Sequence, residues 1–186
     1  MSAPSAPTMS RYSATARLLH WIVALMVLAT IPIGTAMLQE GISRSTQDTL
    51  FILHKNGGVI ILVLVLARIV WRALNPPPPL PATLPAVQRL ASKVVHLGLY
   101  AALLFMAFTG YVRVTAGGFP IEMLDAIGFP RLAPRSDALA DTAKALHNVG
   151  RFVLVPLILL HLGAAAYHGA IKRDGIFSRM WPPVGR

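Results

Sequence analysis

Four long apolar stretches constrain this chain more than any other feature of its sequence. They run roughly over residues 18–38, 51–74, 94–112 and 147–171, and each is long enough to cross about 30 Å of hydrocarbon. Only helices and closed barrels satisfy their backbone hydrogen bonds inside lipid, and none of the stretches alternates with the period of a strand. We therefore predict an all-α, integral membrane four-helix bundle, with a transmembrane domain over 18–171 and tails over 1–17 and 172–186.

The composition supports a membrane protein and excludes several other classes. Hydrophobic residues make up 55% of the chain and charged residues 13%, about half the charged share of a typical soluble domain. The net charge of +10 would suit nucleic acid, but the basic residues lie between the apolar stretches rather than in one stripe, so we expect no nucleic-acid partner. Because cysteine is absent, disulfides, iron–sulfur clusters, thiolate metal sites and covalently attached haem are excluded.

The distribution of positive charge predicts how the bundle is oriented. Ten of the 17 Lys and Arg residues fall on the side of the two termini, and six of the seven acidic residues, all but Asp174, fall on the other side. By the positive-inside rule both termini are expected in the cytoplasm. Arg11 and Arg17 precede the first apolar stretch as in a signal peptide, but the stretch is too long and ends without a small-residue cleavage site, so we interpret it as a retained span.

Two loops differ from the rest of the chain. Pro76–Pro79 form a short, stiff connector between the second and third spans. The longest loop, residues 115–141, lies on the opposite side of the membrane. Within it, residues 119–125 are expected to form a short interfacial turn of helix, and the segment from Asp137 is expected to be helical and to continue into the fourth span.

All six histidines lie inside a span or at its edge. Ionisable side chains in such places are costly and are usually functional. A single histidine in such a place often only forms a hydrogen bond between helices, but that interpretation explains six such histidines poorly. The six are His20, His54, His96, His147, His161 and His168.

The spacing of the histidines predicts two pairs. His147, His161 and His168 are separated by 14 and 7 residues, which are close to whole helical turns, so they share one face of the fourth helix. By depth, His54 matches His147 near one membrane surface and His20 matches His161 nearer the other. Each level would then hold one imidazole from each of two helices.

Two facing imidazoles suit a haem better than zinc. A six-coordinate haem needs two axial ligands from the protein, whereas zinc needs three or four ligands at one point. Small residues that would leave room for a macrocycle lie near the histidines, although ordinary helix packing also uses such residues. They are Gly57, Gly58, Gly150 and the segment 163–166.

These residues together resemble the bacterial four-helix cytochrome b-561 family, whose best-understood members are di-haem superoxide:ubiquinone oxidoreductases of the inner membrane. The resemblance extends from about Arg11 to Pro182. The motifs that carry it are Arg17-Leu18-Leu19-His20-Trp21, His54-Lys55-Asn56-Gly57-Gly58, Arg68-Ile69-Val70-Trp71-Arg72 followed by prolines, and the three histidines of the fourth span.

The resemblance implies two haem b groups, one held by His20 and His161 on the cytoplasmic side and one by His54 and His147 on the periplasmic side. It also places His168 near a bound quinone and makes His96 a histidine that is not an axial ligand. The implied location is the inner membrane of a bacterium. The implied partners are the lipid bilayer, ubiquinone, and superoxide or another periplasmic electron donor.

Other polar residues become candidates for this activity. Lys55, Lys144 and Arg151 stand beside the periplasmic pair and could attract an anion such as superoxide, or they could extend to lipid headgroups. We predict catalytic roles for Lys55 and Arg151 at that end. At the cytoplasmic end His168 is predicted to move quinone protons, since imidazole exchanges protons near neutral pH.

Arg68 and Arg72 lie four apart on one helix face and are predicted to bind haem propionates. For Arg72, anchoring by the positive-inside rule is the stronger alternative.

Two other functions remain open at the level of sequence. The same haems could serve an electron-transfer subunit that receives electrons from a periplasmic dehydrogenase or a soluble cytochrome, because both functions use the same ligands. Histidine pairs could also belong to a metal or proton transporter. A transporter would be colourless, and broken helices or inverted repeats would support it; the sequence shows neither.

Overall fold

The computed structural model describes residues 11–81 and 83–183, and every regular element in this part of the chain is helical. Four helices are long and apolar enough to cross a membrane, which confirms the all-α, four-span prediction. They are α1 (Ala14–Ala36), α2 (Arg44–Leu74), α3 (Ala86–Ala116) and α5 (Asp137–Ala166), the last of which a π-helix, η1 (Tyr167–Lys172), continues. The short elements are α4 (Glu122–Ala126) and the 3-10 helix η2 (Phe177–Arg179).

Serine side chains determine where three of the spanning helices begin. Ser13, Ser43 and Ser136 stand at the N-caps of α1, α2 and α5. Each hydroxyl accepts a hydrogen bond from the backbone N–H three residues ahead, at 3.2–3.3 Å, and so satisfies a donor that the helix leaves free. The helices therefore start before the apolar stretches do. As predicted, α4 falls within the long loop, and α5 begins at Asp137.

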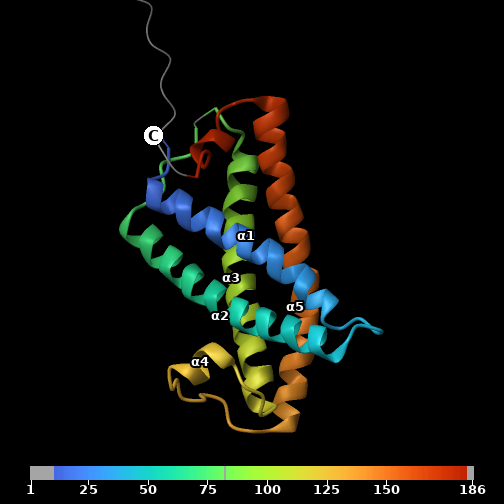
Figure 1. Ribbon diagram of the computed structural model, residues 1–186. Coiled ribbons are helices and arrows are strands. Elements are labelled where there is room, and N and C mark those ends of the chain that lie inside the picture. Colours follow the sequence, from blue (N-terminus) through green and yellow to red (C-terminus); the bar gives the residue numbers. More distant parts are fainter. Residues whose placement is uncertain (1–10, 82, 184–186) are drawn as a thin grey trace, which may run out of the picture.

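The four spanning helices pack mainly as two pairs, α1 with α2 and α3 with α5, and α2 also contacts α3. In Figure 1, the first pair crosses the second obliquely. We call the end of the bundle where α1 begins and η1 finishes the tail end, and the end that carries α4 the loop end. Residues 1–10 and 184–186, which belong to the two predicted tails, lie outside the described residues.

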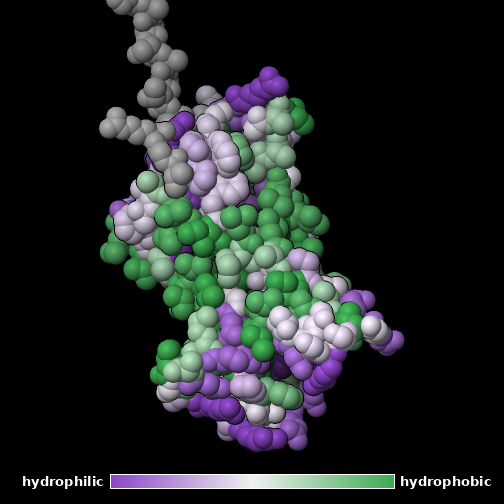
Figure 2. All heavy atoms as spheres, in the orientation of Figure 1, coloured by the Kyte–Doolittle hydropathy of each residue, from purple (hydrophilic) through white to green (hydrophobic). Residues whose placement is uncertain are grey.

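On the face shown in Figure 2, apolar side chains form a band across the middle of the molecule, and polar side chains gather towards its two ends. Many large apolar side chains of the helices are exposed, as expected where lipid is the solvent. The buried cluster in the interior is small and consists of Val23, Val27, Ile61 and Val65. Along α1 and α2 this cluster lies between the depths of His20 and His54, so an apolar layer separates the two histidine levels.

The chain reverses direction after η1 and returns over the tail end. Arg173 has a positive φ of 50° and makes the turn. We call residues 174–183 the C-terminal strap. Trp21 Nε1–H donates to the carbonyl of Met180 at 2.9 Å, and Arg17, only 4% exposed, donates to the carbonyl of Pro182 at 2.9 Å. The strap thus connects the end of the last span to the first turns of α1.

The strap also holds the proline connector. Arg179 is 2% exposed, and its guanidinium donates to the carbonyls of Pro78 and Pro79. The proline-rich loop therefore lies against the strap and is part of the packed tail end.

Candidate functional site

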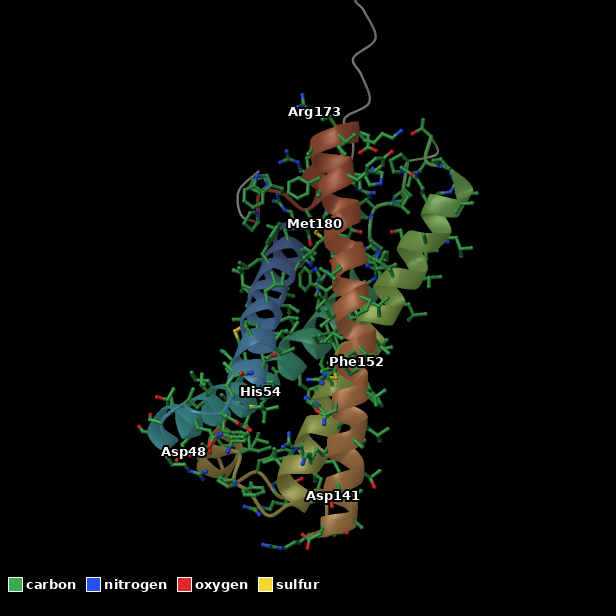
Figure 3. All side chains as sticks on the ribbon, turned by 90° about the vertical axis from the view of Figure 1, so that its right-hand side faces the viewer. Asp48, His54, Asp141, Phe152, Arg173 and Met180 are labelled. Carbon is green, nitrogen blue, oxygen red and sulfur yellow. The ribbon has the colours of Figure 1, made fainter. Side chains whose placement is uncertain are left out.

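The structure brings together both of the predicted histidine pairs. The ring centres of His20 and His161 are 5.9 Å apart, with the ring planes at 80°. Those of His54 and His147 are 6.2 Å apart, with the planes at 81°. We call the first the tail-side pair and the second the loop-side pair. Helix α5 contributes one histidine to each pair, while α1 and α2 each contribute one. Figure 3 shows His54 between the loop end, marked by Asp48 and Asp141, and the tail end, marked by Arg173.

Hydrogen bonds set the protonation of both rings in the loop-side pair. His54 Nδ1 lies 3.2 Å from the carbonyl oxygen of Thr30, which can only accept, so His54 donates from Nδ1. His147 Nδ1 lies 3.1 Å from Thr109 Oγ1, whose own proton is directed to the carbonyl of Phe105 at 2.8 Å. His147 therefore also donates from Nδ1. In both neutral rings the lone pair is left on Nε2, as in a histidine that ligates a metal through Nε2.

Two glycines leave space for these rings. A Cβ at Gly34 would lie 2.6 Å from His54 Cε1, and a Cβ at Gly110 would lie 3.2 Å from His147 Cε1. Sequence reasoning named other glycines, such as Gly150, which instead faces Met106 and Phe105. A signal for the first two was present: Gly34 and Gly110 follow His20 and His96 by 14 residues, the spacing that also separates the two paired histidines of α5.

The tail-side pair has a third histidine beside it. The ring of His96 lies 5.2 Å from that of His161, at 70°, and Ser92 Oγ is 3.3 Å from His96 Nδ1. His20 Nδ1 is buried and finds no hydrogen-bond partner among the described residues. Since buried polar atoms are nearly always satisfied, His20 is not held in the way a purely structural histidine would be.

The pairs have the dimensions that axial haem ligation requires. A metal–imidazole bond is about 2 Å long, so two imidazoles on opposite faces of one iron have ring centres roughly 6 Å apart. The measured 5.9 and 6.2 Å agree with this separation. No group of three or more His, Cys, Asp or Glu within residues 11–81 and 83–183 is arranged to hold a metal ion. The residues of both levels therefore fit haem b.

Lys55, a predicted catalytic residue, anchors α4. Its Nζ lies 2.6 Å from Glu122 Oε1 and 2.7 Å from the carbonyl of Pro120. Asn56 donates to Glu122 Oε2 at 3.0 Å and accepts from the Met123 N–H at 3.0 Å. Partial burial alone would raise the pKa of Glu122, but the hydrogen bonds and charge of Lys55 outweigh it and lower that pKa. We call these contacts, which begin one residue after His54, the α4 clamp.

The other cations of the loop end differ in their exposure and in what surrounds them. Arg151 is exposed, and its guanidinium stands over the exposed ring of Phe152 at 4.8 Å. Lys144 is exposed as well. Arg113, which sequence reasoning did not select, is only half-exposed and lies within electrostatic range of both His54 and His147.

The two arginines predicted at the tail end, Arg68 and Arg72, also differ in burial. Arg68 is half-buried within electrostatic range of the tail-side pair and of His96, and its guanidinium stands 5.6 Å from the ring centre of Tyr100. Arg72, one turn further along α2, is exposed. The structure thus places Arg68 next to the histidines and Arg72 towards the surface.

His168, the predicted proton carrier, has an acidic partner that sequence reasoning left out. Its Nδ1 lies 2.6 Å from Asp174 Oδ2, and its side chain is 13% exposed. Asp174 Oδ1 also accepts from the backbone N–H of Ile176 at 3.2 Å, which fixes the carboxylate. A signal was available, because Asp174 is the one acidic residue that the loop assignment places on the side of the termini. His168 itself lies in the π-helix η1, an irregularity often found at functional sites.

Comparison with known proteins identifies the family. A family model described as prokaryotic cytochrome b561 matches residues 11–183. The chain is 32% identical to "Cytochrome b561 homolog 2" of Escherichia coli over 93% of this chain and 92% of that protein. It is 30% identical to "Cytochrome b561 homolog 1" of the same organism over 94% and 98%. It is also 30% identical to the "Probable superoxide oxidase CybB" of Yersinia pestis over 92% and 96%. The chain therefore belongs to the prokaryotic cytochrome b561 family, the multi-pass proteins of the bacterial inner membrane that transfer electrons with haem b.

Proposed function

We propose that this cytochrome binds two haem b groups and moves single electrons from periplasmic superoxide to ubiquinone in the membrane. The observation that carries the proposal is the presence of two imidazole pairs, at 5.9 and 6.2 Å, at two depths of one bundle. The similarity to a relative named as a probable superoxide oxidase supports the choice of donor. The positive-inside rule supports a cytoplasmic tail end and a periplasmic loop end.

The chain's own residues would hold the two haems. His54 and His147 would ligate at the loop side through Nε2, the nitrogen that their hydrogen bonds leave with a lone pair. His20 and His161 would ligate at the tail side. When bound, haem b supplies a one-electron ferric–ferrous couple. The apolar cluster of Val23, Val27, Ile61 and Val65 keeps water out of the layer between the two levels.

The overall reaction balances two one-electron steps against one two-electron step. Two superoxide anions each give up one electron and leave as O₂, and one ubiquinone takes up two electrons and two protons to become ubiquinol. At the loop end, the positive charges of Lys55, Lys144 and Arg151 would draw the anion in. Lys55 would act at the same time as the anchor of α4, because its Nζ already contacts Glu122.

At the tail end, His168 would deliver protons to the quinone. Asp174 holds its Nδ1 at 2.6 Å, so the opposite nitrogen is oriented for exchange with a quinone oxygen. Arg68 would bind a haem propionate beside the tail-side pair, and Arg72 would contribute from the surface.

A second function is favoured by the exposed apolar side chains of the long loop. Phe119, Ile127 and Leu132 are 64–72% exposed, and a periplasmic dehydrogenase or soluble cytochrome could dock there as the electron donor. The protein would then be an electron-transfer subunit with the same ligands.

The decisive experiment starts with a reduced-minus-oxidised spectrum of purified protein and the number of haems per chain. We expect two b-type haems, and one each in His161→Ala and His147→Ala, while His96→Ala should keep both. Two haems retained in His161→Ala would contradict the pairing, and a colourless wild-type protein would contradict the redox function. Reduction by superoxide close to the diffusion limit supports the oxidase. Reduction only by a protein donor supports the second function.

A further inference from the structure

Arg113 is a cation of the membrane domain that belongs neither to the α4 clamp nor to the proposed haem ligands. It lies in the last turn of α3 and is half-buried. Within residues 11–81 and 83–183, the ion pairs towards the loop end join Lys55 to Glu122, Arg131 to Asp125 and Arg44 to Asp48, and none includes Arg113. A cation that is partly removed from water without a carboxylate partner is costly, so its charge calls for an anion from outside the polypeptide.

The geometry of α3 directs Arg113 towards the loop-side pair. Thr109 Oγ1 lies 3.1 Å from His147 Nδ1, and a Cβ at Gly110 would lie 3.2 Å from His147 Cε1. Arg113 follows them by four and three residues and so shares their helix face. Side chains lean towards the start of their helix, which brings the guanidinium back over that contact. Its charge acts on His54 as well as on His147.

We propose that Arg113 binds, with the two-pronged face of its guanidinium, an anionic oxygen group of whatever occupies the loop-side pair. This rests on the proposed function, and two sources of such oxygens exist there. One is a carboxylate on the rim of the macrocycle, and the other is the superoxide anion on its way to donate. A guanidinium matches two oxygens in one plane, which an ammonium does not.

Each source predicts a different loss when the charge is removed. If Arg113 holds a carboxylate, Arg113→Gln weakens haem retention at the loop side and lowers the midpoint potential of that haem, because a nearby cation favours the reduced state. We expect a shift of about tenfold in the redox equilibrium, which is about 59 mV for a one-electron couple. If Arg113 attracts superoxide, the haem content stays at two per chain, and the rate with superoxide falls at least several-fold at low salt and less at high salt.

The experiment compares full-length Arg113→Gln with Arg131→Gln, a loop-end arginine that is half-exposed and paired with Asp125 at 3.9 Å. Haem content, the two midpoint potentials and the superoxide rate at two ionic strengths are measured for each. Agreement between the two variants in all of these readouts would overturn the proposal, even if Arg113→Gln is less stable. Should that variant not accumulate, Arg113→Lys replaces it, since lysine keeps the charge and loses the fork. Wild-type potentials and rates in Arg113→Lys would then overturn the two-oxygen contact.

Failure of this inference can be told apart from failure of the proposed function. Wild-type protein with two haems and rapid reduction by superoxide, together with an unaffected Arg113→Gln, rejects only the role of Arg113. Wild-type protein without a loop-side haem rejects the proposed function before Arg113 is tested.

Discussion

His168 Nδ1 and Asp174 Oδ2 lie 2.6 Å apart and tie the end of the last membrane helix to the first residue of the C-terminal strap. The carboxylate is also fixed by the Ile176 N–H at 3.2 Å. A histidine held in this way keeps one nitrogen and one orientation for its task. Under the proposed function, this pair would deliver protons to the quinone.

Asp174→Asn should slow quinone reduction without loss of haem. The amide keeps the size of the side chain but removes the charge that orients His168. Because positioned proton transfer is worth about 100- to 10,000-fold, we expect the rate to fall at least about tenfold. The readout is the rate of reduction of a soluble ubiquinone analogue as a function of pH, with haem content measured alongside. Asp141→Asn, an exposed position at the loop end, is the control. A rate within twofold of that control at every pH would mean that the pair is only structural.

Gly34→Ala should damage the loop-side site alone. The added methyl would lie 2.6 Å from His54 Cε1, and the ring has little freedom to move because Thr30 holds its Nδ1. We expect the haem content to fall from about two per chain towards one, with the tail-side haem intact. Thr35→Ala is the matched control, since Thr35 is the next residue on α1 and is exposed. Equal haem content in the two variants would show that Gly34 is not part of the site.

Arg68→Gln should lower the midpoint potential of the tail-side haem more than Arg72→Gln does. Arg68 is half-buried beside the histidines, whereas Arg72 is exposed and is screened by water and salt. We expect about a tenfold shift in the redox equilibrium for Arg68→Gln, about 59 mV, and less than half that shift in millivolts for Arg72→Gln. Redox titration monitored by absorbance measures both. The reverse order would assign the propionate contact to Arg72.

The α4 clamp should loosen in acid. Because the pKa of Glu122 is lowered in the folded protein, its bond to Lys55 stabilises the docked loop fully above the ordinary glutamate pKa of about 4.3. That contribution is lost as the pH falls through the lower folded value. Since Glu122 is partly exposed, the effect is about 1 kcal/mol or less, or up to about a fivefold increase in opening.

Hydrogen exchange at the amides of α4, corrected for intrinsic rates, measures that opening. Glu122→Gln should show the loosened state already at neutral pH and lose the acid dependence. Asp125→Asn, which removes a longer 3.9 Å contact to Arg131, serves as the control. An acid dependence that survives in Glu122→Gln would place the titrating group elsewhere.

The sequence predicts the elements that depend on one helix at a time. Apolar length gives the four spans, and the spacing of 14 residues between His147 and His161 gives two levels with a partner for each. Depth along the chain then pairs His54 with His147 and His20 with His161, and the ring distances agree with both pairs.

What the sequence does not predict depends on how helices rotate and tilt against one another. Lys55 contacts Glu122, 67 residues further along the chain, because α4 folds back on α2. No local sequence pattern predicts that contact. The approach of Gly34 to His54 is set by the packing of α1 on α2. The electrostatic influence of Arg113 on the loop-side pair likewise requires the rotation of α3, which helical period alone leaves undefined.

The contact between the C-terminal strap and α1 implies an order of assembly. Trp21 and Arg17 enter the membrane with the first span, but their partners at Met180 and Pro182 are synthesised only after all four spans. Until then the first helix is positioned only by its packing against the other helices in lipid, because the C-terminal strap is not yet present. The ribosome therefore synthesises the first helix long before the strap that binds it. If translation stalled after the fourth span, the four spans would be complete but α1 would lack its hydrogen bonds to the strap.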